Sequence, residues 1–88
     1  MVPMDLSLGI AAELRAMSES TEALAAAFCA DPELAVRCLP LLQRFDLLAQ
    51  QQAELAALLV RLGEGAMPGQ AVAGVRLAAL AERLGKAA

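Results

Sequence analysis

The sequence predicts an all-α fold: a three-helix bundle, built from a long helical hairpin and a shorter third helix, that associates with itself. Alanine and leucine dominate the chain, and aromatic residues make up only 2% of it. Both residues favour helices, and no segment alternates between polar and apolar residues as a half-buried strand would. Apolar residues recur instead in steps of three and four. The 88 residues form a single domain with a small core, for which self-association is a common source of stability.

The first helix is expected from about residue 5 to 29. Asp5 or Ser7 can cap its beginning, because either side chain can accept a hydrogen bond from a free N–H group of the first turn. One stripe along this helix alternates steps of four and three, with Thr21 as its only polar member. The stripe consists of Ile10, Leu14, Met17, Thr21, Leu24 and Phe28.

The second helix is expected over residues 32–62. Asp31, Pro32 and Glu33 together indicate its beginning: a capping carboxylate, a proline in the first turn, and an acidic side chain near the positive end of the helix dipole. Pro40 lies inside this segment, so we expect a kink at residues 36–39. Because the apolar repeat stays in phase across Pro40, we expect one bent helix rather than two separate helices.

The second helix carries the longest apolar stripe of the chain, which predicts a contact with partner helices. Its expected interface residues are Leu34, Leu41, Phe45, Leu48, Gln52, Leu55, Leu59 and Leu62, and Cys38 belongs to the same stripe. Gln52 either fixes the register of the contact or lies where the stripe is half exposed. Further apolar rows beside the stripe, such as that of Leu42, Ala49 and Ala56, widen the arc to more than half of the circumference. We therefore expect this helix to contact both other helices and, in addition, a second copy or another helical protein.

The third helix is expected over residues 70–84, after a loop at residues 63–69. Gly63 is expected to end the second helix as its C-terminal cap, because glycine tolerates the backbone conformation found there. The loop contains further glycines and Pro68, as a flexible connection does.

Composition excludes several classes of function. The formal net charge is −3, the seven basic residues are scattered, and no aromatic platform exists, so we expect no binding of nucleic acid. The absence of histidine excludes His-dependent catalysis and metal sites with His ligands. No cofactor or metal is expected.

No apolar run reaches the roughly 18 residues of a membrane span, and no signal peptide is seen, so we expect a cytoplasmic protein. Cys29 and Cys38 are expected to be reduced, small buried side chains.

Asp46 and Gln50 are four residues apart on the predicted polar face of the second helix, together with Gln43, Glu54 and Arg61. The Asp-x-x-x-Gln pair resembles the catalytic helix of the chemotaxis phosphatase CheZ family. That resemblance covers about nine residues, and it implies that Gln50 orients a water for attack on the aspartyl phosphate of a response-regulator receiver domain. It also implies that Asp46 forms a salt bridge with a lysine of the receiver. Alternatively, both are solvated side chains of an amphipathic helix.

Three hypotheses of function follow. The first is a non-catalytic adaptor or regulator that acts through its apolar helical surface, as a homodimer or with another helical protein. The second is an aspartyl-phosphate phosphatase, or a docking partner, of a phosphorylated receiver domain in two-component or chemotaxis signalling. The third is a small subunit or chaperone whose apolar surface is covered by a larger assembly.

Overall fold

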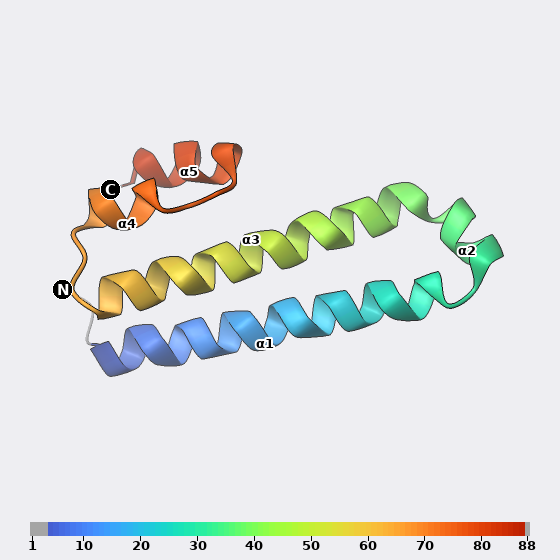
Figure 1. Cartoon of the computed structure of the whole chain (residues 1–88), viewed down its shortest axis with the longest axis horizontal. Coiled ribbons are helices and arrows are strands. Elements are labelled where there is room, and N and C mark those ends of the chain that lie inside the picture. Colours follow the sequence, from blue (N-terminus) through green and yellow to red (C-terminus); the bar gives the residue numbers. More distant parts are fainter. Residues whose placement is uncertain (1–3, 88) are drawn as a thin grey trace.

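The computed structural model describes residues 4–87 and confirms an all-α helical bundle, with no strand among those residues. Two long helices, α1 and α3, lie side by side and antiparallel, and two short helices, α4 and α5, lie along the outer side of α3 (Figure 1). The short helix α2 forms the turn between α1 and α3. The five helices are α1 (Met4–Cys29), α2 (Pro32–Arg37), α3 (Leu39–Gly63), α4 (Pro68–Ala73) and α5 (Ala78–Gly85).

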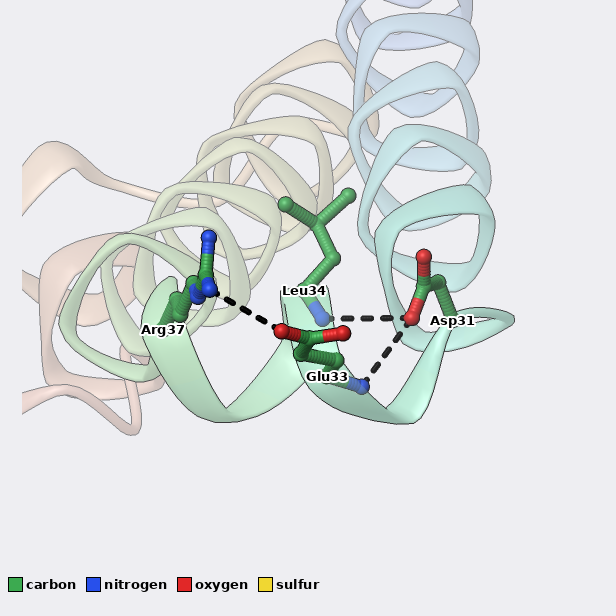
Figure 2. Close-up of polar contacts among 4 residues, drawn as sticks. All are labelled: Asp31, Glu33, Leu34 and Arg37. Carbon is green, nitrogen blue, oxygen red and sulfur yellow. Dashed lines mark hydrogen bonds and ion pairs between the residues drawn. The ribbon is translucent and has the colours of Figure 1, made fainter.

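The turn of the hairpin forms as the sequence predicts (Figure 2). Asp31 has an extended backbone conformation, and its Oδ1 accepts hydrogen bonds from the backbone N–H groups of Glu33 at 3.0 Å and Leu34 at 3.3 Å. Pro32 occupies the first position of α2, where a helix needs no N–H donor. Arg37 Nη2 lies 2.9 Å from Glu33 Oε1, but both side chains are about three-quarters exposed, so this ion pair adds little stability. The turn is therefore held mainly by the Asp31 cap.

The prediction of one bent helix over residues 32–62 is wrong, because α2 ends at Arg37 and α3 begins at Leu39. Between them, Cys38 adopts φ −103° and ψ 15°, outside the helical region. Pro40 explains the interruption: it has no N–H to donate to Val36, and its ring clashes with that carbonyl in a continuous helix. As the second residue of a new helix, Pro40 requires neither the bond nor a bend.

The fully buried part of the contact between α1 and α3 consists mostly of small residues. The buried residues of α1 are Ser7, Ala11, Ser18 and Thr21, and those of α3 are Leu42, Ala49, Ala56 and Leu58, of which the first three follow each other at intervals of seven. Gly63 continues this α3 row: a Cβ atom there would lie only 3.1 Å from Ser7 Cβ. Leu41 and Leu48, which were expected at an interface with a partner helix, lie beside this contact and are exposed, because small side chains let the axes of α1 and α3 approach closely.

Polar groups align the two helices along this contact. Ser18 Oγ donates a hydrogen bond of 2.8 Å to the carbonyl oxygen of Ala49. The hydroxyl of Thr21 lies 2.9 Å from Met17 O and 3.1 Å from Gln52 Oε1, so its single proton is shared between two acceptors. The polar residue of each predicted stripe thus meets the other. Gln52 is half-buried and bonded across the hairpin, which agrees with both alternatives expected for it.

The third predicted helix is instead a pair of short helices. Pro68 begins α4 two residues earlier than expected, α4 ends at Ala73, and α5 starts again at Ala78. The predicted cap, Gly63, is the last residue of α3, and Gly65 has the positive φ, +100°, that reverses the chain. The break lets both short helices contact α3 through a second small core, formed by Leu58, Ala71, Val75 and Leu80.

Two polar side chains of α3 hold this pair of helices. Arg61 donates from Nε at 3.1 Å and from Nη2 at 2.8 Å to the carbonyl oxygen of Ala71, near the end of α4. Glu54 accepts a hydrogen bond of 2.6 Å from the backbone N–H of Arg76, between α4 and α5. Glu54 and Arg61 were expected on a solvated face. That expectation is wrong, because α4 and α5 cover this side of α3.

The helices form a flat slab. The principal extents are 48, 25 and 14 Å, and the radius of gyration is 15.2 Å. A compact domain of this length has a radius of gyration of about 12 Å. Domains generally stack at least two layers of secondary structure around a core. In Figure 1, seen along the shortest axis, α1, α3 and the α4–α5 pair lie next to one another in a single layer. One layer of helices leaves both broad faces of the slab open.

Candidate functional site

The most prominent surface feature is a strip of long apolar side chains on one broad face of the hairpin. We call it the apolar strip, and each of its members is between 40% and 55% exposed. Within each helix, its members are seven residues apart. The strip consists of Ile10, Met17 and Leu24 of α1 with Leu41 and Leu48 of α3.

Helix geometry places both rows on the same face. We call the buried residues between α1 and α3 the contact row. Four of the five members precede one of its residues by one position, as Met17 precedes Ser18 and Leu48 precedes Ala49, and Leu24 precedes the half-buried Ala25, so each is rotated by about 100° in the same sense. Because α1 and α3 are antiparallel and face each other, rotation in the same sense brings both rows to the same side of the hairpin. Ser18 and Ala49 are joined by a hydrogen bond, so Met17 and Leu48 lie at the same level of that face.

The other six residues of the predicted interface are half-buried. Leu55 and Leu62 continue the row of Leu41 and Leu48, but they pack against the second small core beneath α4 and α5. Phe45 stacks on Phe28, with ring centroids 6.0 Å apart, and closes the hairpin near its turn. Gln52 meets Thr21 in the hairpin contact. The remaining two, Leu34 in α2 and Leu59 in α3, are half-buried as well.

A shallow depression adjoins the apolar strip along the first half of α3. It is lined by Leu41, Arg44, Phe45, Leu47, Leu48 and Gln51. One heptad further along α3, the positions equivalent to Leu48 and Gln51 are Leu55 and Leu58, which pack against α4 and α5. The same side of α3 is therefore covered by helices in its second half and open in its first half.

Asp46 and Gln50 lie together on the exposed surface of α3. Gln50 Nε2 donates a hydrogen bond of 2.8 Å to Asp46 Oδ2. Within residues 4–87, the amide oxygen of Gln50 and the second carboxylate oxygen of Asp46 accept no side-chain hydrogen bond. An amide on a rigid helix can orient a water molecule, and a neighbouring carboxylate can bind a cation such as a lysine ammonium.

The remaining candidate groups in the described part of the chain are metal ligands and cysteine thiols. Residues 4–87 contain no group of three or more His, Cys, Asp and Glu side chains that could hold a metal ion. Both cysteines are free thiols. Cys38 is half-buried, whereas Cys29 is exposed, so the prediction that Cys29 is buried is wrong. It lies at the C-terminal end of α1, where the two long helices separate into the turn.

Sequence reasoning identified the members of the apolar strip as apolar helical positions but did not say which side of α3 faces α1. One signal could have shown this: Ala49, Ala56 and Gly63 repeat every seven residues, which marks the side of α3 that another helix can approach most closely. The anchoring roles of Glu54 and Arg61 had no comparable signal, because an acidic and a basic side chain on a helix usually face solvent.

Comparisons with known proteins give no information on function, so the proposals below rest on the geometry described above. No protein-family model, no curated protein and no solved structure matches the chain. Within residues 4–87, no helix is both long enough and apolar enough to cross a membrane.

Proposed function

We propose that the protein is a cytoplasmic, non-catalytic helical interaction module, an adaptor or regulator that binds a helical surface of another molecule through its apolar strip. The observation that carries this proposal is the exposure of five long apolar side chains on one face of a single-layer slab. Monomeric soluble proteins rarely leave a contiguous apolar surface of this kind uncovered. The surface that covers it belongs to a second copy of the chain or to a different helical protein.

The strip is large enough to contribute substantially to binding. Full burial of one leucine, isoleucine or methionine side chain is worth about 1.5–3 kcal/mol, so covering the exposed half of five such side chains contributes about 5 kcal/mol. Their regular spacing also allows a partner helix to insert its side chains between them along the whole strip.

The test compares two neighbouring leucines of α3. Leu48 belongs to the strip and is 45% exposed. Leu47 is 48% exposed and lines the adjoining depression, but it is rotated by about 100° further around α3, at the edge away from α1. Wild type, Leu48→Glu and Leu47→Glu are tagged, captured from cells that produce the protein, and compared by quantitative mass spectrometry. Partners that remain with Leu47→Glu and are lost with Leu48→Glu support the proposal. Identical partners for all three proteins would contradict it.

A second experiment distinguishes a larger assembly from the other possible partners. If the chain is a subunit or chaperone of a larger assembly, the protein expressed alone aggregates or loses fixed packing, and co-expression with the captured partner restores a single soluble complex. A well-folded protein that needs no partner would exclude this version of the proposal.

A second candidate function is catalysis of aspartyl-phosphate hydrolysis on a receiver domain. Its support is the exposure of Asp46 and Gln50 side by side on a straight helix, where a docked protein could reach both. Phosphoryl transfer depends mainly on positioning, and a receiver domain brings its own metal ion, so a single amide that orients water is sufficient chemistry. Asp46 would then pair with a lysine of the receiver.

This candidate is tested on phosphorylated receiver domains from the same genome. If Gln50 orients the water, the wild type accelerates loss of the phosphoryl group, and Gln50→Ala abolishes the acceleration without changing the circular dichroism spectrum. Gln43→Ala, also on the exposed surface of α3, serves as the matched control and retains the activity. No acceleration by the wild type on any receiver would eliminate the phosphatase hypothesis.

A further inference from the structure

We infer that the apolar strip is covered by the apolar strip of a second copy of this chain, so that two hairpins pack face to face as a four-helix bundle around a two-fold axis. This inference rests on the proposed function and names the partner. The thickness of the slab and the composition of its strip support it, and the area of the broad face limits the size of the contact.

The thickness of the slab indicates that one layer of helices is missing. The shortest extent is 14 Å, and helices pack with their axes 8–10 Å apart. A second slab placed on the strip would produce a bundle roughly as thick as the 25 Å width of the slab. The buried small residues then remain between α1 and α3, while the strips of both copies form a central core that the single chain lacks.

The broad face sets an upper limit on the area that a second copy could bury. Its extents of 48 and 25 Å bound the projected area at about 1,200 Å², and a standard-size interface buries about 800 Å² of each partner. The limit includes α4, α5 and the turn, so contact over the hairpin part that carries the strip gives a dimer of at most standard size.

The strip is compatible with its own copy. In a two-fold interface, residues near the axis meet their own equivalents, so a charged residue there would meet a like charge. The strip itself is apolar, and the one charged side chain that lines the adjoining depression is Arg44. The members of the strip also recur every seven residues along both antiparallel helices. A second copy therefore has the same spacing whether its helices run parallel or antiparallel to those of the first. Two such faces can interdigitate along their length, in the slightly inclined packing typical of four-helix bundles.

The α4–α5 pair is compatible with this arrangement. It packs on the outer side of α3, next to Leu58, and leaves Ile10, Met17 and Leu24 of α1 uncovered. It covers Leu55 and Leu62, which continue the row of Leu41 and Leu48, so a second copy can reach the strip without displacing α4 and α5 only along α1 and the first half of α3.

Sedimentation equilibrium over a range of protein concentrations tests the inference on wild type, Leu48→Glu, Met17→Glu and Leu47→Glu. Each substitution occurs twice in a two-fold dimer. We therefore expect Leu48→Glu and Met17→Glu to raise the dimer dissociation constant by at least about 100-fold, and Leu47→Glu to leave it within about threefold of wild type. Circular dichroism confirms that each variant stays helical. Two strip variants on different helices keep the test decisive if one of them does not fold.

Each outcome separates the dimer from the broader proposal. A wild-type dimer that both strip variants dissociate supports the inference. A wild type that is monomeric and folded at about 100 μM overturns it. In that case, a captured partner that is still lost with Leu48→Glu preserves the interaction module with a different occupant. Capture that does not respond to Leu48→Glu contradicts both proposals. A dimer that dissociates with Leu47→Glu and not with Leu48→Glu also overturns the inference, because it places the interface on another face.

Discussion

Substitution of Ala56 by leucine tests whether small residues lie between the two long helices and allow their close approach. Ala56 has no exposed surface and lies in the contact row of α3 with Leu42 and Ala49. The approach of the helices in this row is close, since a Cβ atom at Gly63 would lie 3.1 Å from Ser7 Cβ. The three additional carbon atoms of a leucine at position 56 therefore have no room unless α1 moves away.

The magnitude follows from two losses. Overpacking a well-packed contact costs about 1–3 kcal/mol. Separation of the helices also weakens the 2.8 Å hydrogen bond between Ser18 and Ala49, which contributes about 1 kcal/mol. We therefore expect the free energy of unfolding to fall by about 3 kcal/mol. With a denaturant slope of about 1 kcal/mol per molar urea, the midpoint of unfolding falls by 2 to 3 M.

Urea unfolding followed by circular dichroism at 222 nm measures this change, at one fixed protein concentration because association would shift the midpoint. Ala53→Leu is the matched control, since Ala53 is exposed on the same helix. It should change the free energy of unfolding by no more than about 0.5 kcal/mol. If Ala56→Leu were as stable as wild type or more so, the row of leucines would have to face α1, and the arrangement described above would be refuted.

Three further predictions concern other parts of the chain. Asp31→Ala removes the cap of α2, and it should lower the free energy of unfolding by about 1 kcal/mol in the same urea assay; an unchanged midpoint would show that the cap is not needed. Arg61→Gln removes the bonds to the Ala71 carbonyl, so amide hydrogen exchange should accelerate over residues 68–85 and stay unchanged in α1. Uniform acceleration would show that the chain opens only as one unit. A maleimide added to the native protein should modify the exposed Cys29 before the half-buried Cys38; peptide mass spectrometry showing the reverse order would contradict the described end of α1.

The predicted fold class was right because it depends on local chemistry. Alanine and leucine favour helices everywhere along the chain, and period-two alternation is absent, so an all-α fold follows without knowledge of any contact. The end of the first helix and the cap at Asp31 were right for the same reason, since a capping side chain acts on backbone groups two and three residues away.

For the candidate site, spacing identified residues and left their geometry open, and their role as an interface stays a prediction. Ile10, Met17, Leu24, Leu41 and Leu48 were all recognised as members of helical stripes. Their exposure could not be read from spacing, because the apolar arc of the second helix is wider than one helix contact and offers several rows. For Asp46 and Gln50, spacing alone indicated neighbouring side chains, which the 2.8 Å hydrogen bond confirms. The activity implied by the chemotaxis phosphatase resemblance stays a prediction.

The sequence by itself determined that the chain is helical, where its main turn lies, and that histidine-dependent chemistry is absent. Only the tertiary structure decided that Ala49 and Ala56 lie inside the hairpin while Leu41 and Leu48 lie outside, that Pro40 separates two helices, and that α4 and α5 cover one half of α3. The physical reason is the distance between helix axes. Small residues allow a closer approach with more van der Waals contact and a hydrogen bond between the helices. That gain depends on both helices at once, whereas propensity, capping and periodicity are properties of each segment alone.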